Sequence, residues 1–336
     1  MKSCFIAENA GILNSVYCES VKAKLRDHLG MSEDRVYTKA QVLAEPTAFA
    51  EVEYIFSTWS MPRFEVEEIH RCFPKLKAVM YAAGSVQGIA RPILDCGAEI
   101  FSAWAANAIP VAEVALSHIL LANKGYHMAA YYCSQRADLR RKGAEYVGKN
   151  HGNYGCKVGI IGVGMIGSEV CRLLKHHRLE VLAFDPFCSQ EKARELGIKL
   201  VSLETIFSEC EVISNHLADN EQTKGILNYE LFARMHENTT FINTGRGAQV
   251  VEADLVRALK EKTHACAILD VTNPEPPTED SPFFTLDNVI LTPHLAGSQR
   301  DEWWRMAEYM YEEAMLHDCG KPTHYSVTRQ MLETMA

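Results

Sequence analysis

The sequence lacks the cysteine and histidine spacings that are typical of metal sites and disulfide frameworks. Its 11 cysteines are odd in number and scattered, with no CxxC pair. We therefore expect reduced thiols and a cytoplasmic location. Its 13 histidines form no HExxH motif and no cluster with cysteine, so the sequence predicts no metal site.

Long apolar runs and positive charge are also scarce. No apolar run approaches the length of a membrane span, and the start, MKSCFIAENAG, has no apolar stretch followed by a cleavage site. The formal net charge of −9 argues against a nucleic-acid partner. With 336 residues, 47% of them hydrophobic, the chain is long enough for two globular domains, and we expect neither a membrane nor a nucleic acid as its partner.

One glycine-rich segment indicates a ligand. Residues 157–161 read as a buried strand, and Gly162, Gly164 and Gly167 follow at the spacing GxGxxG, where a helix is predicted to begin. A second apolar run ends in Asp185. In a dinucleotide site, such glycines allow a tight turn and close approach to the pyrophosphate, and the acid binds the ribose diol. The order of strand, glycines, helix, second strand and acid therefore predicts a dinucleotide site. The acid favours NAD over NADP, because a carboxylate disfavours the 2′-phosphate of NADP. The alternative is a glycine turn that binds no ligand.

Strand and helix patterns alternate along the chain. Strands are predicted at 2–7, 54–57, 76–81 and 98–101, and helices at 14–29, 64–72 and 86–95. Further strands are predicted at 157–161, 180–184, 211–215, 240–243, 265–269 and 288–291, with helices between them. This alternation predicts a small α/β unit followed by a doubly wound parallel sheet. A long apolar helix at 107–123 and an amphipathic helix at 299–316 flank that sheet, and the last helix is expected to return to the first domain.

Three ionisable residues follow three successive predicted strands. Arg246 comes after 240–243, Glu275 after 265–269 and His294 after 288–291. Ligands of open doubly wound sheets bind at the carboxyl ends of the strands. Hydride transfer at a carbinol needs a proton acceptor, which an imidazole supplies near neutral pH, and a guanidinium pairs well with a carboxylate substrate. Taken singly, each residue has a plainer explanation as a surface cation, a solvated loop acid or a structural histidine.

The segments GIIGVGMIGSEV, FDPF, INTGRG, DVTNPEP and TPHLAG, in this order and spacing, resemble the D-isomer-specific 2-hydroxyacid dehydrogenases. The resemblance covers nearly the whole chain. It implies a Rossmann NAD domain at 105–298 and a smaller, flavodoxin-like α/β substrate domain at 1–104 and 299–336. It also implies a homodimer, with a dimerisation arm at about 124–154, a segment that has little core pattern of its own.

The same resemblance assigns roles to individual residues. Arg246 orients the substrate, His294 is the acid/base, and Glu275 polarises His294. Substrate-binding residues would be Ala83, Gly84, Ser85 and Arg246. Cofactor-binding residues would be Gly162, Gly164, Met165, Ile166, Gly167, Asp185, His216, Thr244, Gly245, Asp270 and Gly297. Asp270 would hold the nicotinamide amide, and His216 would have a structural role beside the cofactor.

The chain departs from the family pattern at two places. The family usually has proline in a His-x-Pro motif, whereas this chain has His216-Leu217-Ala218, and the frequent tryptophan before the glycine-rich strand is missing from 141–154. Two other functions therefore stay open: an NADH-sensing, corepressor-like binding protein of this fold, and a formate- or phosphonate-type dehydrogenase. Because the sequence shows no long interaction tail, we expect an enzyme that interconverts a 2-oxo acid and a D-2-hydroxy acid. The segment 57–63 supplies Trp59 and Met61 but only one cation, which favours an unphosphorylated acid.

Overall fold

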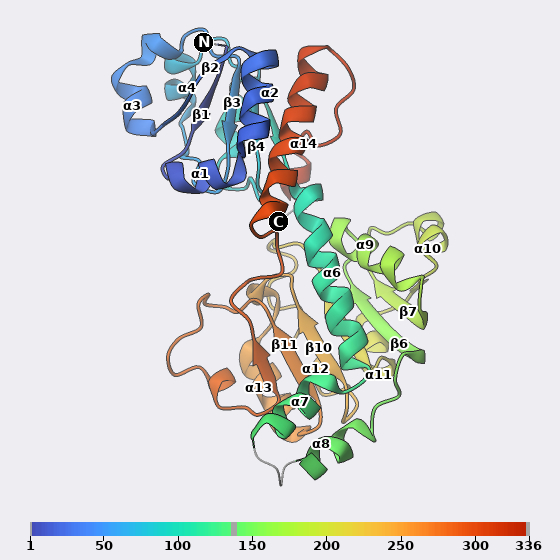
Figure 1. The fold of residues 1–336 in the computed structure, drawn as a ribbon. Helices are drawn as coiled ribbons and strands as arrows, with labels where there is room; N and C mark the ends of the chain where they lie inside the picture. The colour runs from blue at the N-terminus through green and yellow to red at the C-terminus, as the bar shows by residue number, and fades with distance from the viewer. Residues whose placement is uncertain (1, 136–139, 334–336) are drawn as a thin grey trace. The chain divides into compact units, whose positions relative to one another are not determined.

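A computed structural model of the chain describes residues 2–135 and 140–333, which fall into two compact units (Figure 1). One unit comprises residues 1–107 and 298–336, and the other comprises residues 108–297. Each unit contains one sheet whose neighbouring strands run parallel, with helices between them in the chain. The predicted α/β fold class is therefore confirmed.

The first unit is built on a five-stranded sheet. Its strands are β1 (Ser3–Ile6), β2 (Met31–Tyr37), β3 (Tyr54–Ser57), β4 (Ala78–Tyr81) and β5 (Glu99–Ser102). Its helices are α1 (Ala10–Val16), α2 (Glu19–Leu29), α3 (Lys39–Ala44), α4 (Val66–Cys72), α5 (Ala90–Asp95) and α14 (Asp301–Asp318). The strand order β2-β1-β3-β4-β5 is that of flavodoxin-like sheets. Cys4 and Ile6 pack in one core cluster and Phe5 and Ala7 in another, because successive side chains of a strand point to opposite faces.

The second unit is built on a seven-stranded sheet. Its strands are β6 (Tyr154–Ile161), β7 (Arg178–Phe184), β8 (Lys199–Leu200), β9 (Val212–Asn215), β10 (Thr240–Asn243), β11 (Cys266–Leu269) and β12 (Val289–Leu291). Its helices are α7 (Tyr126–Gln135), α8 (Arg140–Val147), α9 (Met165–Leu174), α10 (Gln190–Leu196), α11 (Leu203–Glu209), α12 (Tyr229–Phe232) and α13 (Glu252–Glu261). The order β12-β11-β10-β9-β6-β7-β8 reverses direction between β6 and β9. Such a switch point is where doubly wound sheets bind their ligands.

Polar side chains set where several helices begin. Thr38 and Gln41 form a capping box at the start of α3, and the hydroxyl groups of Ser189 and Ser202 accept hydrogen bonds from backbone N–H groups of α10 and α11. Each cap satisfies a donor that the first helical turn leaves without an intrahelical partner. The helices therefore begin at residues that the sequence marks chemically.

The sequence prediction was wrong at several elements. It omitted β2 and β8 and placed one helix over 14–29, where the structure has α1 and α2. β2 is an edge strand with mostly exposed or half-buried residues, so it has no apolar alternation for a pattern to detect. β8 has two residues. Asn9 caps α1 by accepting a hydrogen bond from the Ile12 N–H, which starts that helix earlier than the apolar pattern suggests.

Two expectations about the middle of the chain also change. The helix α6 (Trp104–Ala122) has mean hydropathy 1.5 and, by length and composition alone, is long and apolar enough to cross a membrane, contrary to the expectation that no run is. However, Ala112, Ala115 and Ile119 lie in a core cluster of the second unit, as in the core helices of globular proteins. The arm at 124–154, of which 136–139 lie outside the described residues, forms α7 and α8 and contributes buried Met128 and Tyr146 to that cluster.

Candidate functional site

The glycine loop after β6 is tight on one side and open on the other. Gly162 has φ +87°, and a Cβ there would lie 2.8 Å from the backbone of His216. A Cβ at Gly167 would lie 1.9 Å from the carbonyl oxygen of Gly162, so the start of α9 packs directly on the turn. A Cβ at Gly164 would meet nothing within 4 Å. The two tight positions fix the turn, whereas Gly164 leaves the space that a pyrophosphate needs.

The N-terminus of α9 and Asp185 complete the dinucleotide fingerprint. α9 begins at Met165 and has no side-chain hydrogen bond at its cap residue, Gly164, so its first N–H groups are suited to an anion. Asp185 follows β7 directly, and its carboxylate accepts hydrogen bonds from the N–H groups of Val163 (2.7 Å) and Phe187 (2.8 Å). The structure therefore brings the predicted acid to the glycine loop.

His294 and Glu275 form a direct pair. They follow β12 and β11, which are neighbours in the sheet, and His294 Nδ1 lies 2.6 Å from Glu275 Oε1. The side chains are 47% and 38% exposed, so water and substrate can reach them. With Nδ1 directed at the carboxylate, Nε2 is the ring nitrogen that remains to serve a reacting group. Among the ionisable residues predicted for the site, these two are in direct contact.

Asp270 organises the backbone that carries His294. Its Oδ1 accepts hydrogen bonds from the Thr292 hydroxyl (2.6 Å) and the Leu295 N–H (2.8 Å), and its Oδ2 accepts one from the Ala296 N–H (2.9 Å). His294 itself has φ +53°, a region that non-glycine residues rarely occupy. Its N–H donates to the Asp270 carbonyl at 3.1 Å. Asp270 therefore holds the turn, next to Gly297, that presents the imidazole.

Arg246 lies in the loop after β10, beside the loop that carries Glu275. A Cβ at Gly247 would lie 2.1 Å from the backbone of Thr272, so the two loops touch through their backbones. Arg246 Nη1 donates to the carbonyl of Gly245 at 2.8 Å. Among the described residues, Arg246 makes no hydrogen bond or ion pair with His294 or Glu275. The guanidinium therefore lies in the adjacent loop, and direct contact is limited to the His294–Glu275 pair.

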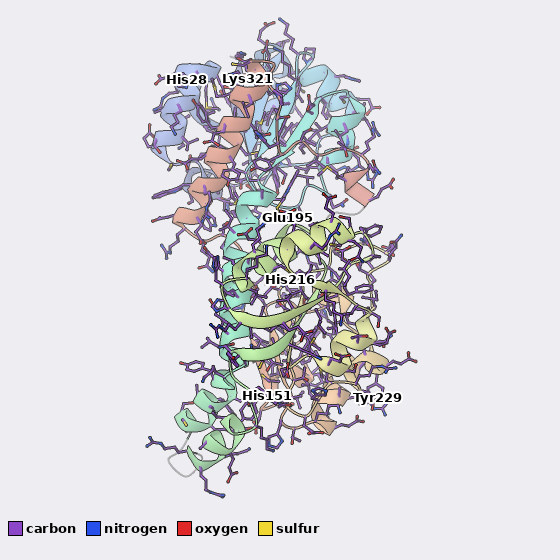
Figure 2. All side chains as sticks on the ribbon, turned by 90° about the vertical axis from the view of Figure 1, so that its right-hand side faces the viewer. His28, His151, Glu195, His216, Tyr229 and Lys321 are labelled. Atoms are coloured by element: carbon purple, nitrogen blue, oxygen red, sulfur yellow. The ribbon has the colours of Figure 1, made fainter. Side chains whose placement is uncertain are left out.

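His216 is a buried neutral residue. Its ring lies between the hydroxyl groups of Ser214 (2.9 Å from Nε2) and Thr244 (3.4 Å from Nδ1), inside the second unit (Figure 2). Burial lowers the pKa of His216 to about 4, because an imidazolium is costly away from water. The ring therefore joins the loops after β9 and β10 as a neutral hydrogen-bonding group.

A buried amide network, which the sequence did not reveal, holds the Arg246 loop. Gln249 Oε1 accepts hydrogen bonds from Asn215 Nδ2 (2.6 Å) and from the Arg246 N–H (3.2 Å). Its Nε2 donates to the carbonyls of Leu217 (2.7 Å) and Ala218 (3.0 Å). Gln249 and Asn215 are fully buried. The one sequence signal was a glutamine just after a GRG segment. Until its burial is known, such a residue is indistinguishable from a surface glutamine.

Asn243 extends this network across the same loop. Its Oδ1 accepts hydrogen bonds from Asn215 Nδ2 and the Gly245 N–H, both at 3.0 Å, and its Nδ2 donates to the Arg246 carbonyl at 3.2 Å. Both backbone groups of Arg246 are thus held by amide side chains. Because buried polar groups that are all satisfied rigidify their surroundings, Gln249, Asn215 and Asn243 position the loop that carries Arg246.

The predicted substrate loop lies in the first unit, after β4. Ala83 is buried, Gly84 is half-buried and Ser85 is exposed. The Ser102 hydroxyl lies within hydrogen-bonding distance of the carbonyl oxygens of both Ala83 (2.9 Å) and Gly84 (2.5 Å). This anchors the carbonyl side of the loop to β5.

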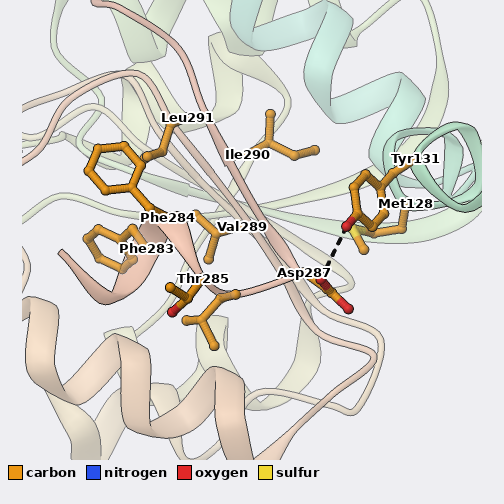
Figure 3. A pocket seen from close by; sticks show the side chains of 10 residues that line it. Met128, Tyr131, Phe283, Phe284, Thr285, Asp287, Val289, Ile290 and Leu291 are labelled. Carbon is orange, nitrogen blue, oxygen red and sulfur yellow. Dashed lines mark hydrogen bonds between the residues drawn. The ribbon is translucent and has the colours of Figure 1, made fainter. Parts of the chain in front are cut away.

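A separate hollow of about 290 Å³ lies at the β12 edge of the second unit (Figure 3). Side chains from α7 and from residues 283–291 line it, and the Tyr131 hydroxyl donates to Asp287 across one side at 3.1 Å. None of the predicted site residues lines it. Within the described part of the chain, no group of three or more His, Cys, Asp or Glu side chains is arranged to hold a metal ion.

Fold and site together define a dinucleotide-binding α/β protein with an imidazole–carboxylate pair at the carboxyl edge of its cofactor sheet. The chain belongs to the D-isomer specific 2-hydroxyacid dehydrogenases: residues 116–296, more than half of the chain, match the NAD binding domain of that family. The predicted family and cofactor are thereby confirmed.

The matches with curated relatives cover only part of each relative. D-3-phosphoglycerate dehydrogenase of Archaeoglobus fulgidus is 33% identical over 239 residues, which are 70% of this chain and 44% of that protein. Glyoxylate reductase of Korarchaeum cryptofilum is 35% identical over 168 residues, 50% of this chain and 51% of that protein. The chain thus spans about half the length of the curated relatives that it matches.

Solved structures share the fold over nearly the whole chain. D-mandelate dehydrogenase of Rhodotorula graminis, in its apo form, has a TM-score of 0.81 at 17% identity and covers 97% of both chains. A phosphoglycerate oxidoreductase from Rhizobium etli has a TM-score of 0.78 at 21% identity and covers 98% of this chain and 99% of that one. At such identities the likeness shows the fold.

Proposed function

We propose that this protein is an NAD-dependent oxidoreductase that interconverts a 2-oxo acid and a D-2-hydroxy acid. The observation that carries the proposal is the 2.6 Å pair between His294 Nδ1 and Glu275 Oε1. His294 and Glu275 follow β12 and β11. These strands belong to the same parallel sheet as β6, and the turn between β6 and α9 carries the dinucleotide fingerprint. The names of the relatives, which include D-3-phosphoglycerate dehydrogenases and a glyoxylate reductase, support the same reaction class.

The residues of the second unit fit a dinucleotide. The open space at Gly164 and the uncapped start of α9, with Met165 and Ile166, suit the pyrophosphate. Asp185 suits the ribose diol, and we expect Thr244, Gly245 and Gly297 to line the nicotinamide end. Bound NADH would supply the hydride. That Asp270 holds the nicotinamide amide stays a prediction, because its carboxylate already binds the turn around His294.

His294 and Glu275 supply the proton chemistry in this proposal. During reduction, protonated His294 donates from Nε2 to the carbonyl oxygen as negative charge develops there. Glu275 fixes the ring orientation through Nδ1 and stabilises the imidazolium by its charge. In the oxidation direction, neutral His294 accepts the hydroxyl proton. The pair therefore needs both an ionised carboxylate and an imidazole that changes its protonation state.

Arg246 and the Ala83–Ser85 loop bind the substrate carboxylate in this proposal. A guanidinium presents two parallel N–H donors that match the two oxygens of a carboxylate, and the amide network around Gln249 holds the backbone of Arg246 on both sides. The Ala83–Ser85 loop contributes backbone N–H groups, as the family resemblance implies. Orientation of the 2-oxo group then follows from fixing the neighbouring carboxylate.

Turnover with a panel of 2-oxo acids tests this function. The purified chain and NADH are mixed with each acid, loss of NADH absorbance is followed, and the chirality of the product is determined. We expect oxidation of NADH with at least one acid and a D-2-hydroxy product. Binding of NADH without turnover of any acid would favour a sensor protein, and reduction of NAD⁺ only with formate or a phosphonate would favour a different dehydrogenase.

We also propose a homodimer in which the arm at 124–154 contacts the partner subunit. The support is three exposed apolar side chains on its two helices: Tyr126 is 54%, Tyr131 37% and Val147 40% exposed. If these side chains form one patch, that patch is of the kind that marks a contact surface. Sedimentation velocity at micromolar concentration should show a dimer, and a monomer would contradict the proposal.

A further inference from the structure

An exposed tryptophan lies at the carboxyl edge of the first unit's sheet. Trp59 follows the end of β3 by two residues, and it is 45% exposed. Ser57 of β3 pairs with Tyr81 of β4, so the loops that carry Trp59 and Ala83 begin side by side at the carboxyl ends of these neighbouring strands. The Thr58 hydroxyl donates to the Ala82 carbonyl at 2.8 Å, which holds the two loops together at this point.

A second tryptophan supports the first. The rings of Trp59 and Trp303 are 5.7 Å apart at 69°, the edge-to-face arrangement that aromatic pairs prefer. Trp303 Nε1 donates to the Ser298 carbonyl at 2.6 Å, so the supporting ring is fixed at the start of α14. Trp59 therefore presents an oriented apolar surface on the loop that Thr58 joins to Ala82, the residue before the Ala83–Ser85 loop.

The same edge of the sheet offers little to a phosphate. Across the described loops that follow the five strands of this sheet, the charged residues are Glu8, Arg63 and Glu65. Arg63 Nε is paired with Glu65 Oε1 at 3.1 Å, and Glu8 accepts a hydrogen bond from the Lys39 N–H. Lys39, the first residue of α3, brings a further cation to the Arg63 carbonyl, but this ammonium is paired with Glu68 at 2.7 Å. A phosphorylated acid needs cations or several N–H donors for its extra charges. These loops favour a ligand whose side chain is uncharged.

We propose, on the basis of the function proposed above, that Trp59 backed by Trp303 forms the wall on which the side chain of the substrate packs. The substrate class is then an unphosphorylated 2-oxo acid with a branched or aromatic apolar side chain. A hydrophobic surface discriminates between such acids by roughly 10- to 200-fold per methylene group. This preference separates the chain from relatives named for phosphoglycerate.

The experiment compares kcat/KM for phenylpyruvate, 4-methyl-2-oxopentanoate, glyoxylate and 3-phosphohydroxypyruvate. The wild-type chain should prefer the two apolar acids. Trp59→Ala should lower kcat/KM for them by roughly 10-fold or more while changing that for glyoxylate little, since glyoxylate has no side chain to pack. Trp59→Phe should keep most of the preference, because it keeps a ring.

Trp304→Ala is the matched control. Trp304 lies on α14, the helix that also carries Trp303, and it is 42% exposed. Its Nε1, however, donates to the Ser15 carbonyl on α1. Its removal should leave the ratio between acids unchanged. The proposal is overturned if the wild-type chain prefers 3-phosphohydroxypyruvate, if Trp59→Ala slows all acids equally, or if Trp304→Ala alters the ratio as much as Trp59→Ala does.

Failure of the proposed function gives a different result. If NADH binds but no 2-oxo acid is reduced, the proposed reaction is wrong. The proposal that Trp59 contacts the substrate side chain is then tested by the binding of a 2-oxo acid alone. Phenylpyruvate should quench the tryptophan emission of the wild-type chain with NADH present, and Trp59→Phe should abolish the part that comes from Trp59. Equal quenching in both proteins would overturn the wall independently of turnover.

Discussion

At the residue scale, the site depends on how individual side chains are held. His294 is held by Glu275 at Nδ1 and by Asp270 through its backbone, and Arg246 is held by Gln249 and Asn243 through its backbone. Sequence spacing predicted that Arg246, Glu275 and His294 share one sheet edge, because strand ends meet there. It could not predict Gln249 or Asn215, because an amide's role depends on burial, which no local pattern encodes.

Arg246→Lys tests the carboxylate-binding role. An ammonium group cannot supply two parallel N–H donors, so KM for the 2-oxo acid should rise and kcat should fall, with NADH affinity nearly unchanged. The expected loss of transition-state stabilisation is about 2–4 kcal/mol. Steady-state kinetics and NADH titration measure both effects. If an analogue without a carboxylate suffers equally, Arg246 holds the loop or the cofactor instead.

Gln249→Leu tests the amide network. The leucine leaves the Arg246 N–H and the carbonyls of Leu217 and Ala218 without their present partner. Urea unfolding should show a loss of about 1–3 kcal/mol for such unsatisfied buried groups, and KM for the 2-oxo acid should rise. Gln190→Leu is the control, since Gln190 is exposed on α10 and its replacement should change neither quantity. Loss of stability with unchanged KM would show that the network does not position Arg246.

At the scale of elements, the regular βα repeats of the second unit were the most predictable part. Apolar segments with glycine or ionisable residues at their ends predicted β6, β7 and β9–β12 close to their observed ranges. The irregular elements were missed for physical reasons: β2 is an exposed edge strand, β8 is very short, and α7 and α8 have mixed polar and aromatic faces. Their positions depend on tertiary packing, which overrides weak local preference.

The β6–α9 turn makes two matched alanine substitutions informative. Gly167→Ala places a methyl group 1.9 Å from the Gly162 carbonyl oxygen, so it should destabilise the fold measurably in urea unfolding. Gly164→Ala meets nothing within 4 Å at a negative φ, so stability should change much less while NADH affinity falls by the loss of pyrophosphate space. Calorimetric titration with NADH measures the second effect. Undiminished NADH affinity in Gly164→Ala would place the pyrophosphate elsewhere.

At the scale of the whole molecule, buried neutral histidine makes stability depend on pH. The pKa of His216 is lowered to about 4 by burial, below the unfolded value near 6.5, so the unfolded chain binds more protons between these limits. The contribution of neutral His216 to the free energy of unfolding is therefore fully present above about pH 6.5 and is lost as pH falls toward about 4. His127, whose pKa burial also lowers to about 4, acts in the same direction.

Urea unfolding at about pH 7.5 and about pH 5 measures this dependence. His216 alone should contribute a loss of about 2 kcal/mol between these conditions, at about 1.4 kcal/mol per pKa unit. His216→Gln should show a correspondingly smaller loss, because the amide keeps hydrogen-bonding capacity but does not titrate. An equal loss in both proteins would mean that other groups control the acid sensitivity.

The central claim is that His294 transfers the proton in an NADH-dependent reduction, and the rate of the His294→Ala variant tests it most directly. With a 2-oxo acid that the wild-type chain reduces, kcat should fall by roughly 10²- to 10⁴-fold, the usual contribution of a positioned proton donor. NADH affinity should stay within a few-fold, because the pair with Glu275 lies outside the glycine loop. A variant that retains the wild-type kcat would contradict the account.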